Sequence, residues 1–331
     1  MATGIAPNAS PRTVVYRPTK VLPSLSVSEQ LYILEGCRDD CRIDGRDNTK
    51  LRSFSVLTGD PLILSHGSSR VFLTDKSTQI LCSVKAELVK PSLHRPNEGG
   101  VDLHVDWLLG TPNNAPSKRR LQEQQLRSLL QSLLQDNLVP LTSLCVVPHH
   151  YVWKLAIDVM VVCADGGSVV DLSSRAVYAA LQQTKLAHIT PLVNTNAKST
   201  NNQTGTSTSS KAQTDLAVDS DIQKGIAVDT KDCPVVVSVS VLKCPPKATA
   251  VFVLDTTNEE EVCASSIVYC AVTRQGTVVA VRNQGGSVPV GLLPDITAAA
   301  KQAANDVFGT IDRCTVQTPM ESILQEQFRR F

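Results

Sequence analysis

The stretch Ala164-Asp165-Gly166-Gly167-Ser168-Val169-Val170 constrains this chain more than any other part of its sequence. An alternating apolar run at residues 152–163 precedes it and an Ala- and Leu-rich run at residues 169–186 follows it, so we expect a strand, a glycine turn and a helix. Backbone amides at the start of such a helix can hold an anion. A phosphate-bearing reactant normally also needs an Arg or Lys, and the position after Ser168 holds Val169 instead. The sequence therefore keeps the glycines of a phosphate loop and lacks its cation.

Composition excludes several classes of protein. The 331 residues are 42% hydrophobic and 19% charged, which suffices for one large or two medium domains with a buried core. The chain has 32 Lys and Arg and 31 Asp and Glu, so its net charge does not indicate the basic surface that nucleic-acid binding usually requires. Any RNA contact must therefore be local or shared with partners. Residues 1–20 hold no apolar signal segment, and no run approaches the ~18 apolar residues of a membrane span. We expect a protein of the cytosol or nucleus with no membrane partner.

The cysteine pattern predicts neither a disulfide framework nor a metal site. The ten cysteines are scattered through strand-like segments and never form a Cys-x-x-Cys pair. Cys37 and Cys41 lie four residues apart on a possible helix, but no matching His or Cys pair follows. We therefore expect small buried thiols, no bound metal and no cofactor.

Periodicity predicts an α+β fold with mixed sheets and packed helices. We divide the chain into a flexible tail at residues 1–27, a first half at 28–193, a low-complexity insertion or linker at 194–232, and a second half with its tail at 233–331. Helices are expected at residues 28–36 with Ser28 as N-cap, 118–134, 169–186 and 295–308. Strands are expected at 71–73, 80–88, 101–107, 144–147, 152–163, 235–241, 250–254 and 267–281, the first three in a mostly antiparallel sheet. The second half repeats the order of strands then helix, which predicts two similar α+β units packed together.

Two sets of apolar side chains are expected in the core. Trp107 and Trp153 lie in alternating strands. In the helix at residues 118–134 the leucines fall on one face by helical spacing, namely Leu121, Leu126, Leu129, Leu130, Leu133 and Leu134.

Several short motifs together resemble the RNase PH family, and within it the ring subunits of the eukaryotic RNA exosome. The motifs, in chain order, are Ser28-Glu29, Tyr32-Ile33-Leu34-Glu35-Gly36, Arg42-Ile43-Asp44-Gly45-Arg46, Ser69-Arg70-Val71, Val84-Lys85-Ala86-Glu87, Pro96-Asn97-Glu98-Gly99 and Leu144-Cys145-Val146-Val147-Pro148. The resemblance covers residues 28–190 well and residues 233–310 more loosely. It implies an RNase PH-type fold, with a ribosomal protein S5 domain 2-like half and a C-terminal RNase PH half, and a place in a six-membered ring capped by three RNA-binding proteins.

The resemblance also allows a test of catalysis. Catalytic members of the family degrade RNA from its 3′ end by phosphorolysis, with a Gly-Gly-Thr-Arg loop for phosphate and two aspartates six residues apart. The loop's Thr falls on Ser168 and its Arg on Val169; the aspartates fall on Glu261 and Ile267. Because Val cannot orient phosphate and Ile cannot hold a metal or donate a proton, the chain is not expected to be an enzyme by itself.

Other charged groups have a functional and a structural interpretation. Lys118, Arg119 and Arg120, with Arg127 in the helix body, are candidates for RNA contact and equally for solvated positive charge. The run at residues 259–261 is interpreted as a solvated loop rather than a metal site. His149 and His150 are interpreted as a strand edge rather than a stacking or acid–base pair.

We interpret the sequence as a non-catalytic structural subunit of the exosome core ring, which forms the RNA channel and supports 3′-to-5′ RNA processing and degradation in rRNA maturation and mRNA decay. The resemblance implies as partners other RNase PH-like ring subunits, one as a close pseudo-dimer partner, RNA-binding cap subunits and single-stranded RNA, in the nucleus, nucleolus and cytoplasm. The alternative is the RNA-binding half of a composite phosphorolytic site. A lone RNA-binding module is disfavoured because aromatic residues are only 4% and no stacking signature is present.

Overall fold

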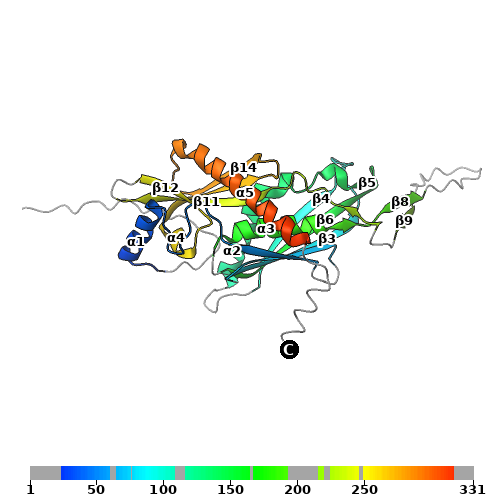
Figure 1. Cartoon of the computed structure of the whole chain (residues 1–331). Coiled ribbons are helices and arrows are strands. Elements are labelled where there is room, and N and C mark those ends of the chain that lie inside the picture. Colours follow the sequence, from blue (N-terminus) through cyan, green and yellow to red (C-terminus); the bar gives the residue numbers. More distant parts are fainter. Residues whose placement is uncertain are drawn as a thin grey trace, which may run out of the picture.

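The computed structural model describes residues 24–59, 65–75, 77–108, 116–164, 167–192, 215–219, 224–245 and 249–316. Residues 1–23 of the expected tail and residues 194–214 of the expected insertion lie outside this set. The described residues form an elongated α+β body (Figure 1), which confirms the expected fold class.

A six-stranded sheet forms the centre of the first half. Its path is β1-β2-β3-β6-β4, and β5 pairs with β6. The strands are β1 (Phe54–Thr58), β2 (Gly67–Leu73), β3 (Thr78–Val89), β4 (Gly100–Trp107), β5 (Cys145–Val147) and β6 (Tyr151–Ala164). All pairs are antiparallel except β4 with β6, which run parallel. The expected mostly antiparallel sheet is therefore confirmed, with β4 as the exception.

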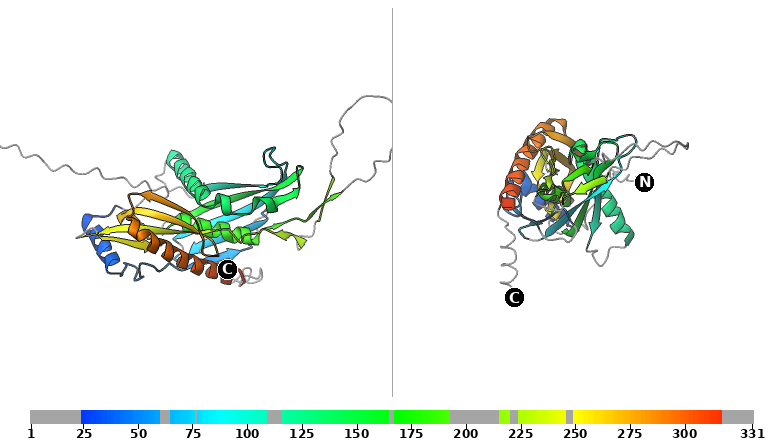
Figure 2. Two further views of the ribbon diagram at one scale, coloured as in Figure 1. Left: turned by 90° about the horizontal axis from the view of Figure 1, so that it is seen from above. Right: turned by 90° about the vertical axis from the view of Figure 1, so that its right-hand side faces the viewer.

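A four-stranded antiparallel sheet forms the second half, in the order β12-β11-β13-β14. Its strands are β11 (Val235–Cys244), β12 (Thr249–Leu254), β13 (Ala264–Val272) and β14 (Val278–Gly285). Two small ribbons lie outside the main sheets: β7 (Lys185–Leu186) with β10 (Ile226–Ala227), and β8 (Ile189–Leu192) with β9 (Asp215–Val218). Two of these strands, β9 and β10, fall inside the stretch that we assigned to the linker. The ribbon of β8 and β9 extends away from the body as an arm (Figure 2).

The helices are α1 (Val27–Arg38), α2 (Pro116–Leu134), α3 (Val169–Gln183), α4 (Asn258–Cys263) and α5 (Leu293–Val316). Helix α3 contacts β2 and β3 of the first sheet and β11 of the second. Every residue from Val169 to Leu181 is buried, because both sheets cover this helix. Its small Ala and Ser side chains suit such close contact from two sides. One continuous hydrophobic cluster therefore joins the two halves, from Val71 of β2 to Val237 of β11.

Two helix details differ from the sequence expectations. The N-cap of α1 is Ser26 rather than Ser28: the Ser26 hydroxyl accepts from the Glu29 N–H, and the Glu29 carboxylate accepts from the Ser26 N–H. In α2, Leu126, Leu130, Leu133 and Leu134 are buried and Leu129 is partly buried, but Leu121 is 46% exposed. The α2 core face therefore starts one turn later than the leucine spacing suggested. Trp107 is buried as expected, and Trp153 packs against the same cluster while partly exposed.

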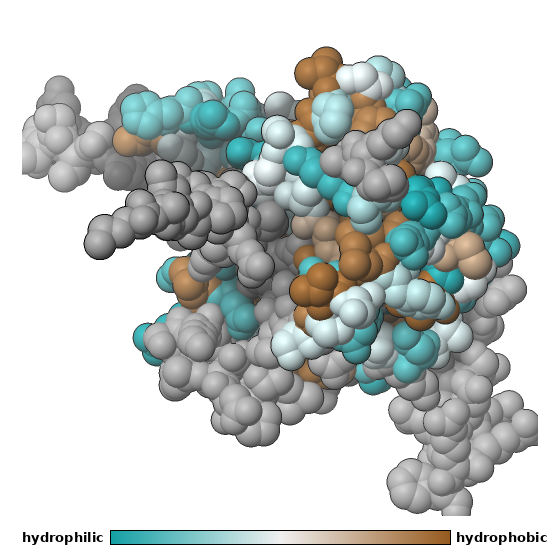
Figure 3. All heavy atoms as spheres, turned by 90° about the vertical axis from the view of Figure 1, so that its left-hand side faces the viewer, coloured by the Kyte–Doolittle hydropathy of each residue, from teal (hydrophilic) through white to brown (hydrophobic). Residues whose placement is uncertain are grey.

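Apolar surface is exposed where the molecule carries α1 and β12. This end shows apolar areas set among polar ones (Figure 3). The exposed apolar side chains of α1 and the segment after it are Val27, Leu31, Tyr32 and Ile43. The opposite side of α1 is anchored by Ile33 and Cys37, which pack on Leu242 of β11 and Val253 of β12. Within the described residues, no helix is both long and apolar enough to cross a membrane.

Candidate functional site

The start of α3 is where the sequence predicted a phosphate loop. The Ser168 hydroxyl caps the helix by accepting from the Asp171 N–H at 3.4 Å. Ser168 is 6% exposed and Val169 only 1%, and Val169 belongs to the hydrophobic cluster between the sheets. Residues 165 and 166 lie outside the described set. The position expected to hold the phosphate cation therefore carries an apolar side chain that packs inward.

A guanidinium that the sequence analysis did not single out lies against this turn. A methyl group on Gly167 would overlap the Arg52 guanidinium, so a larger residue here would displace Arg52 from its present position. Arg52 is itself held by Asp255: its backbone N–H donates to the carboxylate at 2.7 Å and its Nη2 at 2.6 Å. Arg52 Nε also donates to this carboxylate at 3.1 Å, and Nη2 donates to the Thr256 carbonyl at 3.3 Å. The cation nearest the glycine turn is thus paired with a carboxylate of its own chain.

Asp255 is the centre of this cluster. Its side chain is fully buried, and its backbone has φ of +46°, the left-handed region that Asp tolerates better than most residues. Burial alone would raise the pKa of the carboxyl, but the hydrogen bonds and charge of Arg52, with the more distant charge of Arg175, lower it to about 2. Arg46 Nη1 lies 3.6 Å from the same carboxylate. Asp255 is therefore a permanent anion at physiological pH.

The Arg42–Arg46 motif has a structural role next to this cluster. Arg42 pairs in a bidentate manner with Glu260, and both side chains are buried. Its remaining donors reach the Leu254 carbonyl at 3.0 Å and the Asp255 carbonyl at 3.1 Å. Buried guanidinium and carboxylate groups satisfied in this way fix two segments against each other. The motif thus holds the segment before β1 against the second half.

The acidic run at residues 259–261 was expected in a solvated loop, and this prediction was wrong. The run forms part of α4, where Glu260 is 1% and Glu261 8% exposed. Glu260 also completes a capping box with Thr257. The charge pattern could not reveal this, because the partner of Glu260 is Arg42, 218 positions away.

The two positions aligned with family aspartates do not form an acidic site. Ile267 is 5% exposed on β13, opposite Ser240 of β11, and packs in the core. Glu261 lies on α4, its N–H bonded to the Thr257 carbonyl. Among the described residues there is no group of three or more His, Cys, Asp and Glu side chains placed to hold a metal ion.

A second buried charged cluster lies on α3. Asp171 is fully buried and accepts from the Ser238 N–H at 3.1 Å and from its hydroxyl at 2.8 Å. Burial raises the pKa of Asp171 to about 6, although Arg175 opposes the rise. The Arg175 guanidinium is fully buried 4.5 Å above the Phe54 ring, and its nitrogens have no hydrogen-bond partner among the described residues. Arg175 therefore contributes to the core and does not replace the missing loop cation at the protein surface.

The structure describes only some of the side chains that were expected to face RNA. The side chains of Lys118 and Arg119 lie outside the described set. Arg120 is exposed and Arg127 half-exposed, and neither forms an ion pair within the part of the chain that is described. His149 and His150 lie in the exposed turn between β5 and β6, and His149 has φ of +64°. The structure thus places the two histidines in a turn between two strands rather than at the expected strand edge.

Sequence reasoning missed Arg52 and Asp255, which determine the electrostatics of the site. They are 203 positions apart, so no local spacing connects them. The only available signal was that Asp255 ends an alternating apolar strand, which is also common in ordinary turns.

Comparison with known proteins agrees with this architecture. Residues 50–187 match the model of the 3′ exoribonuclease family, domain 1. The chain is 28% identical over 162 residues to exosome complex component rrp43 of Schizosaccharomyces pombe, covering 48% of this chain and 58% of the relative. It is 33% identical over 159 residues to exosome complex component Rrp42 of Sulfurisphaera tokodaii, covering 47% and 56%. The chain therefore spans less than two thirds of the length of these relatives.

A solved structure has the same fold. An Archaeoglobus fulgidus exosome with RNA bound to the active site includes a chain that superposes with a TM-score of 0.64 at 21% identity, over 85% of this chain and 97% of that one. The match extends beyond the family model into the second half. Residues 50–187 thus match domain 1 of the 3′ exoribonuclease family, and the chain is similar to proteins named exosome complex components.

Proposed function

We propose that this chain is a ring subunit of an exosome-type complex and contributes no phosphorolytic site of its own. One observation carries the proposal: the α3 start has buried Val169 where phosphate would need a cation. Nearby Arg52 does not compensate, because the Asp255 carboxylate neutralises it. Phosphoryl transfer depends on positioning and on charge stabilisation, so a site without a free cation cannot perform it.

The expected surroundings of the chain follow from its relatives. Several of them are named exosome complex components, and one neighbour in fold is an exosome with RNA in its active site. We propose that this chain likewise assembles with RNase PH-like subunits, one of them as a close pseudo-dimer partner, and with RNA-binding cap subunits. Exposed Val27, Tyr32 and Ile43 support a protein-binding role for the α1 end. The proposed setting is rRNA maturation and mRNA decay in the nucleus, nucleolus and cytoplasm.

One observation favours a second candidate function. Arg120 is exposed on α2 and has no ion pair within the described residues. A free guanidinium at this place suits a phosphate of RNA. The chain would then supply the RNA-holding half of a composite site whose phosphate loop belongs to a partner.

The experiment measures phosphate-dependent release of nucleoside diphosphates from a short 3′-labelled single-stranded RNA. It compares the full chain alone with the chain in complex with co-expressed RNase PH-like partners. We expect co-purification and no release from either preparation. Release by the chain alone would overturn the non-catalytic assignment, and failure to form any complex would overturn the ring assignment.

If only the complex releases nucleoside diphosphates, two variants decide between the candidates. Arg119→Glu with Arg120→Glu reverses the charge at the start of α2, and Arg95→Glu makes one such reversal in the exposed turn after β3. Loss of release with the α2 variant alone supports the composite site. Equal release of nucleoside diphosphates by all complexes would support a structural role for the chain.

A further inference from the structure

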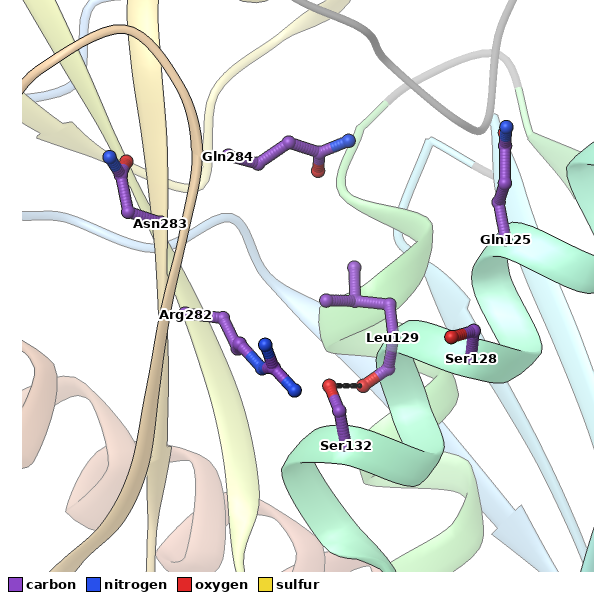
Figure 4. A pocket seen from close by; sticks show the side chains of 7 residues that line it. All are labelled: Gln125, Ser128, Leu129, Ser132, Arg282, Asn283 and Gln284. Carbon is purple, nitrogen blue, oxygen red and sulfur yellow. Dashed lines mark hydrogen bonds between the residues drawn. The ribbon is translucent and has the colours of Figure 1, made fainter.

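A pocket lined by Leu129 and several polar residues lies where the two halves of the molecule meet, between α2 of the first half and β14 of the second. Its volume is about 310 Å³, close to the lower end of the range for small-ligand sites. Figure 4 shows Arg282 and Gln284 of β14 facing Gln125, Ser128 and Ser132 of α2. None of the residues that line the pocket belongs to the glycine turn or is aligned with a catalytic position of the family.

The positive charge of this pocket is free. Arg282 is exposed, and its side chain forms neither an ion pair nor a hydrogen bond with any described residue. Several other arginines differ in this respect, since they pair with carboxylates: Arg38, Arg42, Arg46, Arg52, Arg95 and Arg274. Because alternate residues of a strand point to the same side, Arg282 and Gln284 both face α2, whereas the Asn283 amide turns away and donates to the Gly286 carbonyl. The guanidinium therefore points into the pocket without a counter-ion.

The α2 side adds hydrogen-bonding groups and no negative charge. Ser132 donates its hydroxyl to the Leu129 carbonyl at 2.8 Å, which leaves its oxygen lone pairs toward the pocket. The Ser128 hydroxyl has no hydrogen-bond partner among the described residues. No Asp or Glu lines the pocket. Its formal charge is thus +1, from Arg282.

The pocket is distinct from the cations that the sequence singled out. At roughly 100° per residue, Gln125, Ser128 and Ser132 share one flank of α2. Arg120 and Arg127 lie to one side of this flank, roughly a third of a turn away. A ligand in the pocket would therefore contact Arg282 and not these two arginines.

We propose that this pocket binds a phosphate group of single-stranded RNA, with Arg282 as its cation. The inference rests on the proposed function, which supplies the RNA. A phosphodiester carries one negative charge, which matches the pocket's single positive charge, and its two free oxygens fit the parallel donors of a guanidinium. The Ser128 hydroxyl can donate a further hydrogen bond. The chain thereby holds RNA without the lost phosphate loop.

The test measures fluorescence anisotropy of a 5′-labelled ten-nucleotide oligoadenylate titrated with the full chain at several salt concentrations. We expect Arg282→Gln to weaken binding about tenfold at low salt and to reduce the slope of log K against log salt by about 0.7, the value for one phosphate contact on a single strand. Arg282→Lys should bind between the two, because it keeps the charge and loses the bidentate geometry. Lys301→Gln, an equal charge change at an exposed position of α5, should leave binding unchanged.

Competition with inorganic phosphate and with AMP separates the possible sources of the phosphate group. Displacement of RNA only by longer oligonucleotides supports the proposal, and displacement by inorganic phosphate at micromolar concentration assigns the pocket to free phosphate and overturns it. Equal effects of Arg282→Gln and Lys301→Gln, or no RNA binding by the wild-type chain, would also overturn it. Co-purification of Arg282→Gln with ring partners is scored separately, so failure of this inference is distinguishable from failure of the ring assignment.

Discussion

At the scale of single residues, buried charged groups surround the glycine turn at the start of α3. Asp255 accepts three hydrogen bonds from Arg52 and lies fully buried, while Val169, the position at which the resemblance implies a phosphate-binding arginine, packs in the core. These residues stabilise the fold, and the described cation that lies against the glycine turn, Arg52, is paired with Asp255. Restoring the family residue by Val169→Arg would force a guanidinium into the core and would test stability rather than catalysis.

Asp255→Asn is expected to lower the free energy of unfolding by about 3 kcal/mol at pH 7, because it leaves the Arg52 guanidinium without its charge partner. Asn also tolerates positive φ, so the substitution isolates the charge. Urea denaturation measures the effect. The control is Asp312→Asn, which removes the exposed partner of Arg274 and should cost less than about 1 kcal/mol. Equal costs would show that burial adds nothing to the Arg52 pair.

The two buried aspartates have opposite pH dependence. The folded pKa of Asp255, about 2, lies below the ordinary value, so its stabilisation is present above about pH 4 and is lost as the pH falls toward 2. The folded pKa of Asp171, about 6, lies above the ordinary value, so folding becomes less favourable as the pH rises from about 4 to 6.

Asp171→Asn should abolish this loss of folding stability between about pH 4 and pH 6. The difference in unfolding free energy between Asp171→Asn and wild type should therefore shift in favour of the variant by up to about 3 kcal/mol between pH 4 and pH 7. Urea denaturation across this pH range measures the difference. A difference that stays constant with pH would mean that Asp171 is already ionised at pH 4.

At the scale of elements, the sequence interpretation predicted helix α1 correctly but assigned its N-cap to the wrong serine. The motif Ser26-Val27-Ser28-Glu29 contains two candidate N-caps, and only Ser26 has Glu at the third helical position. That spacing is the signature of a capping box and was available in the sequence. The structure contains this box, with 2.7 Å between the Ser26 nitrogen and the Glu29 carboxylate.

Ser26→Ala should destabilise the protein by about 1 kcal/mol, because the first turn of α1 loses its acceptor. Ser28→Ala is the matched control and should be neutral or slightly stabilising, since Ala favours the helix interior. Thermal unfolding followed by circular dichroism compares the two variants. A larger loss with Ser28→Ala would restore the sequence-based assignment.

At the scale of the whole molecule, α3 and the arginine pairs make the two halves interdependent. Helix α3 is buried between both sheets, and Arg42 joins the segment before β1 to Glu260 of the second half. The sequence predicted two similar α+β units, and the structure joins them through one hydrophobic cluster. Neither half can expose its face of α3 without losing much of its buried apolar surface.

Thermal unfolding should consequently show a single calorimetric transition, with the calorimetric enthalpy equal to the van't Hoff enthalpy, because the halves share one core. Differential scanning calorimetry of the full chain is the measurement. Two separate transitions would indicate halves that fold independently.

The sequence by itself determined the fold class, most helices and strands, and the absence of a cation after Ser168. These features depend on local periodicity and on residue identity, which are readable along the chain. Only the tertiary structure decided that Val169 faces the core, that Glu260 and Glu261 of the acidic run are buried, and that Arg52 and Arg42 pair with Asp255 and Glu260. It also brought Arg282 opposite α2. These contacts join residues more than a hundred positions apart, and burial and pairing at such separations arise from packing, which no local pattern encodes.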